Sequence, residues 1–330
     1  MLVQNFTADQ FEIFFDQIFD DKIDDNSVKN FLLDLNQNNI PLNSMIGAVL
    51  ALKKRSLKIT CNHDVLDVCG TGGDKLNTLN ISTAVAFTLA SMGVKILKHG
   101  NKAVSSNSGS ADIFSRLNID FYEDEQLILN DLNQKNLSFL FAPFFHPALK
   151  KLAKIRQEIN QPTIFNYLGP LLNPANPKSQ VIGIAKYAMM EKYSQVIAKI
   201  NPSANIYLVH GFDGMDEITT TDKSYLLKII GGEIQPISII NPDEFGITRV
   251  TIADLIGGDS DFNSKKMLDL FASAQNLPYL EIVALNSAFA LQLINKILDI
   301  KEAVKYCKNH IVSGKVMEYL TKNYPKLPQN

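Results

Sequence analysis

Apolar side chains recur at helical spacing through the first sixty residues. One stripe follows the i, i+3, i+4, i+7 pattern of a helix face and comprises Phe11, Phe14, Phe15, Ile18 and Phe19. Thr7 and Gln10 precede it with the spacing of a capping box. A second stripe comprises Val28, Phe31, Leu32 and Leu35. Pro41 opens a third helical segment that runs to about Lys54. The pattern predicts a small helical unit whose phenylalanine-rich face is either its core or a subunit contact.

Beyond residue 64 the pattern changes to short apolar runs separated by helical stretches. The runs with strand length and composition are 65–69, 94–99, 137–142, 180–185 and 205–210. The helical stretches between them include 83–92, 147–159 and 187–200. This alternation predicts an α/β fold with a mainly parallel central sheet, with ligands gathered at the carboxyl ends of its strands. The Pro- and Asn-rich segment 166–180 is the expected crossing between domains.

Composition and charge exclude several classes of protein. The 330 residues include 32 basic and 34 acidic side chains, so the net charge is -2 and no broad nucleic-acid or membrane footprint is expected. The N-terminus lacks the basic-then-apolar order of a secretory signal, and no apolar run is long enough to span a membrane. The three cysteines are typical of a reducing compartment, and Cys61 and Cys69 match no known zinc spacing. We therefore expect a cytoplasmic protein.

A glycine-rich segment, Gly70–Asp74, follows the first predicted strand directly. Glycines allow backbone N–H groups to approach an anion, and the positive end of helix 83–92 would face the same point. Further donors follow in Thr78, Asn80, Ser82 and Thr83. The spacing matches neither the P-loop nor the dinucleotide fingerprint, so a tight strand-to-helix turn with polar caps remains the alternative.

A second polar loop follows the next strand, over Lys98–Asp112. Lys98 and Lys102 supply positive charge, and the side-chain donors are Ser105, Ser106, Asn107 and Ser110. Taken alone this is also compatible with a solvated loop. Two donor-rich loops at successive strand ends instead favour a ligand with several phosphates.

Two acidic residues, Asp216 and Glu217, follow the strand 205–210. Mg²⁺ prefers one or two protein carboxylates together with waters and substrate phosphates. An adjacent pair of carboxylates is usually a solvated turn, but here it ends a strand of the same predicted sheet. The pair is therefore a candidate Mg²⁺ site beside the two phosphate loops.

His146 and Arg156 lie at opposite ends of the helical stretch 147–159. Ten residues of helix would separate them by about 15 Å, so they would line a groove without contacting one atom. Pro147 suits the first position of that helix. Arginine is rare here, with only four in the chain, and its planar fork suits a carboxylate. Arg156 is a candidate carboxylate clamp, with a surface charge as the alternative.

Together these segments resemble the anthranilate phosphoribosyltransferase family over nearly the whole chain. The family's run Gly-Thr-Gly-Gly-Asp, Thr and Asn-x-Ser-Thr stands at Gly70–Asp74, Thr78 and Asn80–Thr83. Its Lys-His-Gly-Asn loop stands at Lys98–Asn101. Further matching segments are 105–106, 109–112, 141–150, 164–175, 210–217, 285–291 and 311–320.

The resemblance implies a reaction and a domain plan. The 5-phosphoribosyl group of phosphoribosyl pyrophosphate, bound with Mg²⁺, passes to the amine of anthranilate in the second step of tryptophan biosynthesis from chorismate. A small helical domain over 1–63, joined by part of 150–178, would precede an α/β domain over 64–330 that binds phosphoribosyl pyrophosphate. A homodimer would form through the helical domain.

The resemblance also implies site residues, and it implies no acid or base among them. Those for phosphoribosyl pyrophosphate are Gly70, Gly73, Asp74, Thr78, Asn80, Ile81, Ser82, Thr83, Lys98, His99, Gly100, Asn101, Lys102, Ala103, Val104, Ser105, Ser106 and Ser110. Those for anthranilate are Gly70, Asn101, His146 and Arg156. Those for the metal are Ser82, Asp216 and Glu217.

The chain departs from the family pattern at Lys102, Lys154, Ile155 and Pro162, and none of these departures removes a residue that is assigned to the chemistry of the reaction. Two other functions remain open. A pyrimidine nucleoside phosphorylase shares the fold and a similar lysine loop, but the glycine loop and the acidic pair favour pyrophosphate and magnesium. A nucleic-acid-binding paralogue would need a basic groove, which the charge pattern does not predict.

Overall fold

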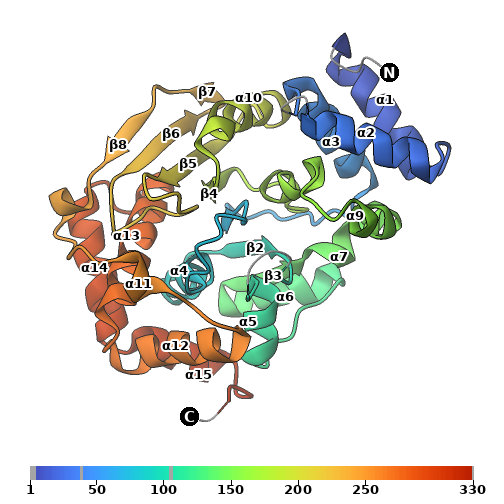
Figure 1. Ribbon diagram of the computed structural model, residues 1–330. Coiled ribbons are helices and arrows are strands. Elements are labelled where there is room, and N and C mark those ends of the chain that lie inside the picture. The colour runs from blue at the N-terminus through green and yellow to red at the C-terminus, as the bar shows by residue number, and fades with distance from the viewer. Residues whose placement is uncertain (1–4, 38–39, 104–106, 329–330) are drawn as a thin grey trace.

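The computed structural model describes residues 5–37, 40–103 and 107–328 (Figure 1). Three helices open the chain: α1 (Ala8–Phe19), α2 (Asp25–Gln37) and α3 (Leu42–Arg55). The predicted capping box is confirmed, with Thr7 and Gln10 each accepting from the other's backbone N–H. The phenylalanine stripe is buried except for the half-buried Phe14: the rings of Phe15 and Phe31 meet edge to face, as do those of Phe15 and Phe165. This face therefore packs within the chain.

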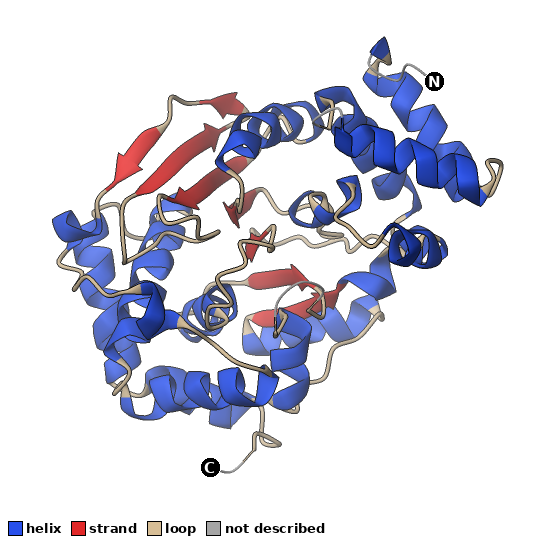
Figure 2. Ribbon diagram, in the orientation of Figure 1, coloured by secondary structure: helices blue, strands red, loops and turns tan. Residues whose placement is uncertain are grey.

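The described residues form one eight-stranded sheet in the order β3-β2-β1-β4-β5-β6-β7, with β8 also paired to β6. Figure 2 draws the strands in red. The first five strands are parallel, and all five match predicted runs: β1 (Leu66–Gly70), β2 (Ile96–Gly100), β3 (Leu137–Phe141), β4 (Ser179–Gly183) and β5 (Asn205–Gly211). The sequence pattern missed three antiparallel strands: β6 (Ser224–Ile230), β7 (Glu233–Ile234) and β8 (Ser238–Ile240). The fold is α/β with a mainly parallel sheet, as predicted.

Helices cover both faces of this sheet. Those along the middle of the chain are α4 (Ile81–Ser91), α5 (Ser110–Arg116), α6 (Glu125–Lys135), α7 (Ala142–Phe145), α8 (Pro147–Lys151), α9 (Ala153–Ile159) and α10 (Met190–Ile200). Those near the C-terminus are α11 (Ile252–Leu255), α12 (Ser260–Ser273), α13 (Leu277–Leu293), α14 (Ile300–Val312) and α15 (Lys315–Asn323). No helix within the described ranges has the length and apolar character needed to cross a membrane.

Alternate residues of β4 and β5 enter two separate cores. Val181 and Val209 pack with α4 and the C-terminal helices, whereas Ile182 and Leu208 pack with the N-terminal helices and α10. This follows from the two-residue period of a strand, which points successive side chains to opposite faces. The second core also contains side chains from 148–172, so this later segment packs with the first sixty residues.

The helical stretch predicted over 147–159 is confirmed except for a break at Leu152. The structure has two short helices, α8 and α9, which meet at Leu152. Pro147 occupies the start of α8 as predicted. Since the stretch is not a single helix, the rise of about 15 Å calculated between His146 and Arg156 does not apply.

Candidate active site

The carboxyl ends of the parallel strands bring the predicted loops to one edge of the sheet. Gly70 at the end of β1 pairs with Gly183 at the end of β4, and Gly183 pairs with Val209 of β5. On the other side, Gly100 at the end of β2 pairs with Phe141 of β3. In-register parallel pairing therefore places the loops after β1, β2 and β5 along one rim, where ligands of open α/β sheets bind.

The glycine loop wraps around the carboxylate of Asp216. The backbone N–H of Gly72 donates to Asp216 Oδ2 at 2.8 Å. A Cβ on Gly70 would lie 2.4 Å from Asp216 Oδ2, and one on Gly183 would lie 1.5 Å from its backbone oxygen. Gly72 and Gly73 have positive φ values of 65° and 82°, which favour glycine. The glycines thus admit a close approach by the chain's own carboxylate.

Three carboxyl groups crowd together at this point. Burial, repulsion from Asp74 and a hydrogen bond with its side chain raise the pKa of Asp216 to about 7. Burial raises the pKa of Glu217 well above its usual value, and repulsion from Asp216 adds to this while Lys98 opposes it. Asp216 and Glu217 are only half-buried as whole residues, yet their carboxyl groups are buried deeply enough for desolvation to be the main cause of both pKa shifts. Such a cluster favours a nearby cation.

Lys98 lies beneath this acidic cluster. Its side chain is only 1% exposed, and Nζ donates to Val68 O at 2.5 Å and Ser82 Oγ at 3.1 Å. Burial lowers the pKa of Lys98, whereas Asp67 and Glu217 oppose that shift. The lysine therefore acts from inside the protein, as a counter-charge to the acidic cluster and as a support for Ser82.

The rest of the first polar loop divides between surface and core. Gly73 is exposed, and Asp74, Thr78 and Ser82 are half-buried at the rim. Ile81 and Thr83 are buried in α4, at 2% and 1% exposure. Asn80 uses its side chain within the protein, as its Nδ2 donates to Ser108 O at 3.1 Å.

The second polar loop is tied at both of its described ends. Asp112 Oδ2 accepts from the backbone N–H groups of Ala103 and Gly109, each at 2.9 Å. A Cβ on Gly100 would lie 2.1 Å from Ser110 Oγ, so this strand end also needs glycine. The side chains of Asn101 and Lys102 are exposed at the rim. Three predicted residues, Val104, Ser105 and Ser106, lie outside the described residues.

Two buried histidines form a separate group. The Nε2 atoms of His99 and His146 are 3.3 Å apart, with their rings nearly edge to face. Burial lowers the pKa of His99 to about 3, helped by proximity to His146, and lowers the pKa of His146 to about 4. Both rings are therefore neutral at pH 7 and can exchange a hydrogen bond with each other or a ligand.

Arg156 lies on α9, in contact with the segment that follows. Its guanidinium is 5.9 Å from the centre of the Phe165 ring, and Nη2 donates to Asn166 Oδ1 at 3.4 Å. Burial lowers the pKa of Arg156 without removing its charge. The arginine has no carboxylate partner among the described residues, which leaves its fork available to a ligand.

Sequence reasoning missed a buried carboxylate that supports the histidine side. Asp67 is 0% exposed and accepts from His99 N, Asn173 Nδ2 and Gln180 Nε2. It ties β1 and β2 to the crossing segment 166–180. The only signal was an aspartate inside an apolar strand, which requires buried partners.

A second missed residue supports the acidic pair. Asp213 accepts from Met215 N at 3.0 Å and from the hydroxyls of Thr219 and Thr221. These bonds hold the turn that leads from β5 to Asp216. The partners come after the turn, so the aspartate alone gave no sign of its role.

Within the described ranges, no group of three or more His, Cys, Asp or Glu side chains has the arrangement of a complete metal site. Mg²⁺ does not require one, because waters and phosphates supply most of its ligands. The crowded carboxyls of Asp74, Asp216 and Glu217 fit such a partly protein-bound cation.

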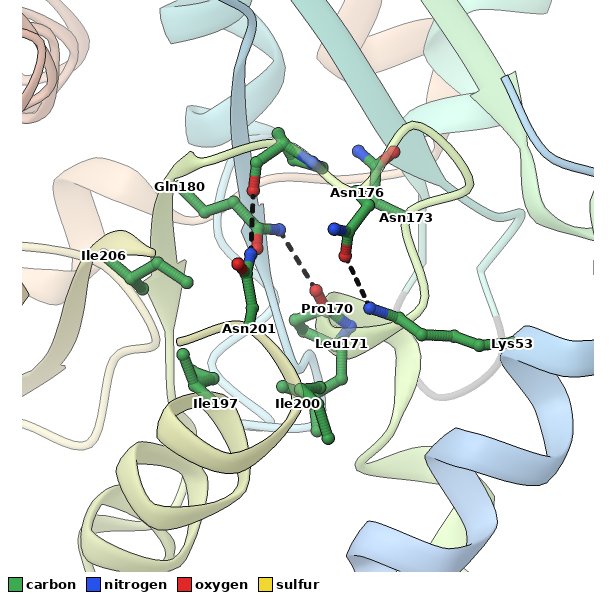
Figure 3. Close-up of a pocket in the computed structure, with 11 residues that line it drawn as sticks. Lys53, Pro170, Leu171, Asn173, Asn176, Gln180, Ile197, Ile200, Asn201 and Ile206 are labelled. Carbon is green, nitrogen blue, oxygen red and sulfur yellow. Dashed lines mark hydrogen bonds between the residues drawn. The ribbon is translucent and has the colours of Figure 1, made fainter. Parts of the chain in front are cut away.

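A small cavity of about 10 Å³, roughly one water in size, lies elsewhere (Figure 3). It adjoins the start of β4 and the end of α10, opposite to the strand ends that carry the predicted loops. Lys53 borders it and donates to Asn176 Oδ1 at 2.6 Å, and burial lowers its pKa to about 8. None of the predicted site residues lines this cavity.

Comparison with known proteins defines the class. Residues 62–317 match the family described as the glycosyl transferase family, a/b domain. The anthranilate phosphoribosyltransferase of Dictyoglomus turgidum is 40% identical over 275 residues, which cover 83% of this chain and 81% of that protein. The anthranilate phosphoribosyltransferase of Persephonella marina is 34% identical over 321 residues, covering 97% and 94%. The chain belongs to the anthranilate phosphoribosyltransferase family.

Solved structures agree with the fold. Anthranilate phosphoribosyltransferase from Saccharomyces cerevisiae, in complex with PRPP and Mg, has a TM-score of 0.87 and 25% identity, covering 97% of this chain and 93% of that chain. The enzyme from Thermus thermophilus has a TM-score of 0.88 and 25% identity, covering 97% and 95%. The likeness therefore extends over both the helical and the α/β parts.

Proposed function

We propose that this chain transfers the 5-phosphoribosyl group from phosphoribosyl pyrophosphate to the amine of anthranilate. The products are N-(5-phosphoribosyl)anthranilate and pyrophosphate, and the reaction is the second step of tryptophan biosynthesis from chorismate. One observation carries the proposal: the glycine loop, the Lys98 loop and the Asp216–Glu217 pair converge at the ends of β1, β2 and β5. The family membership and the yeast relative's complex with PRPP and Mg support it.

Phosphoribosyl pyrophosphate would lie across the two polar loops. Backbone N–H groups of the glycine loop and the positive end of α4 suit its phosphates. The proposed contacts are Gly70, Gly73, Asp74, Thr78, Asn80, Ile81, Ser82, Thr83 and 98–106, with Ser110. Because Lys98, Thr83 and Ile81 are buried, their side chains contribute by supporting the loops.

Mg²⁺ is the proposed cofactor, held by Ser82, Asp216 and Glu217. The cation would neutralise charge that develops on the departing pyrophosphate. Asp74 lies against Asp216 and adds to the local negative charge. Lys98 opposes the raised pKa of Glu217, and a bound cation would favour the ionised form of both carboxylates.

Anthranilate would lie towards His99, His146 and Arg156. Arg156 would pair with its carboxylate, and the neutral His146 would adjoin the ring, with Gly70 and Asn101 at the junction. An aromatic amine is neutral at pH 7, so its lone pair can attack C1 of the ribose without a strong base. The C1–N bond forms as the C1–O bond to pyrophosphate breaks, and the surplus amine proton passes to solvent.

The assembly of the protein follows the same proposal. We infer a helical domain over 1–63 joined by part of 150–178, because both segments share one core with each other. The α/β domain then covers 64–330. A homodimer through the helical domain and a cytoplasmic location complete the proposal.

The deciding experiment follows anthranilate fluorescence in the purified protein. Fluorescence should fall only when phosphoribosyl pyrophosphate and Mg²⁺ are both present, with release of one pyrophosphate per anthranilate. Phosphorolysis of thymidine or uridine without anthranilate turnover would instead identify a nucleoside phosphorylase. Salt-sensitive DNA binding without turnover would identify a nucleic-acid-binding paralogue.

A further inference from the structure

A segment far along the chain, 255–263, lies against the first phosphate loop. Leu79 N donates to Leu255 O at 2.9 Å, and Gly257 N donates to Asn77 O at 2.8 Å. Thr78 and Ile256 form an antiparallel bridge between these bonds. The stretch between the glycine loop and α4 is therefore held by a short pairing with residues almost 180 positions later.

Asn263, in the first turn of α12, extends this pairing with its side chain. It is 2% exposed, and its Nδ2 donates to Asn80 Oδ1 at 2.9 Å. Its Oδ1 accepts from Gly258 N at 2.8 Å. Because a backbone N–H can only donate, Gly258 sets which end of the Asn263 amide faces Asn80.

The orientation of the Asn263 amide in turn sets the orientation of the Asn80 amide, which reaches the second phosphate loop. Asn80 Oδ1 accepts from Asn263, so the Asn80 NH₂ group faces Ser108 O, to which it donates at 3.1 Å. Three bonds thus run in one direction, from Gly258 through Asn263 and Asn80 to Ser108. This ordered chain of bonds, the amide relay, joins the loop after β1 to the loop after β2.

Close packing around the amide relay requires glycine at position 257. A Cβ on Gly257 would lie 2.7 Å from Asn263 Oδ1 and 2.8 Å from Thr78 O. Only glycine at this position lets the segment approach both the phosphate loop and Asn263. The backbone of Asn80 is held as well, since Tyr279 Oη donates to Asn80 O at 3.1 Å.

We propose that Asn263 is a positioning residue for phosphoribosyl pyrophosphate, acting through Asn80 to hold the two phosphate loops at a set separation. The inference rests on the proposed function and deepens it. Asn263 lies in α12, outside every motif that indicated the site, and we expect it to affect the phosphate substrate without touching it.

The test compares Asn263→Ala with Asn201→Ala, a matched loss of a buried asparagine. Asn201 is 9% exposed and donates to Pro177 O at 3.4 Å, far from the phosphate loops. Asn263→Ala should raise the KM for phosphoribosyl pyrophosphate about three- to tenfold, the effect of one lost hydrogen bond. The KM for anthranilate should change less than about twofold, and Asn201→Ala should change neither KM beyond that limit.

Two further variants keep the test decisive. Asn263→Asp retains the bond from Gly258 but cannot donate to Asn80, so it should raise the same KM even if Asn263→Ala fails to fold. In an Asn80→Ala background, Asn263→Ala should add less than about twofold, because the relay is already broken. Additive effects, or an unchanged phosphoribosyl pyrophosphate KM, would overturn the inference. Inactive wild-type protein would overturn the proposed function itself.

Discussion

Two parts of the candidate site lie at the same edge of the sheet but differ in their charge. We call them the acidic side, around Asp216 and Glu217, and the histidine side, around His99 and His146. On the acidic side, burial and mutual repulsion raise carboxyl pKa values, so the cluster is poised to accept a cation. On the histidine side, burial lowers the pKa values to about 3 and about 4, so the rings stay neutral.

This difference matches the chemistry proposed for each side. A leaving pyrophosphate gains negative charge, which Mg²⁺ and backbone donors can stabilise. The attacking amine must remain neutral to keep its lone pair, and histidines with lowered pKa values carry no imidazolium proton that could protonate it at pH 7. The proposed site thus has an acidic side that would bind a cation and a histidine side that stays uncharged at pH 7.

The largest expected effect tests the acidic side. Asp216→Asn with Glu217→Gln should lower kcat/KM by at least about a hundredfold and weaken the response to Mg²⁺, because the metal loses both protein carboxylates. Turnover measured across a Mg²⁺ titration checks this. The exposed Asp222→Asn serves as control and should keep wild-type kinetics. A wild-type Mg²⁺ response in the double variant would remove these residues from the metal site.

Arg156→Ala tests the other side. It should raise the KM for anthranilate about ten- to a hundredfold, because a hydrogen bond to a charged group contributes about 1.5–3 kcal/mol. Steady-state kinetics with each substrate varied in turn will show whether the phosphoribosyl pyrophosphate KM stays near wild type. Lys154→Ala, an exposed change on the same helix, is the control. An unaltered anthranilate KM would show that Arg156 is not the clamp.

His146→Gln tests whether the histidine side is neutral. The folded pKa of about 4 lies below the ordinary 6.5, so between these values the unfolded chain binds more protons. Stability from this group is therefore present above pH 6.5 and is lost as pH falls towards 4, by up to about 1.4 kcal/mol per unit. Urea unfolding at pH 7, 6 and 5 should show a shallower loss in the variant. Equal slopes would mean that His146 is protonated in the folded state.

The smallest effect is expected away from both sides, at the Lys53 cavity. Lys53→Met removes a bond to Asn176 but also a buried charge, so the free energy of unfolding should change by less than about 1 kcal/mol. Both KM values should stay as in wild type. A clear kinetic effect would extend the functional region to the amino ends of the strands and weaken the contrast between the two sides.

Much of the fold was predictable because its signals are local. Thr7 and Gln10 marked the first helix, and apolar runs marked the five parallel strands. Two of the antiparallel strands, β7 and β8, were missed because they are very short and mostly exposed, which leaves no apolar pattern. The third, β6, is mostly buried and follows the polar stretch after Asp216 and Glu217. The break at Leu152 was missed because nothing in its residue type opposes a helix.

The sequence by itself determined the fold class, the family and the residue types of the site. Those follow from periodicity and from motifs whose members are close in the chain. Only the tertiary structure decided that Lys98 is buried, that Asp216 enters the glycine loop, and that Asn263 bonds to Asn80. These contacts join residues from 16 to 183 positions apart in sequence. Their geometry depends on how whole strands and helices pack, and no local pattern contains that information.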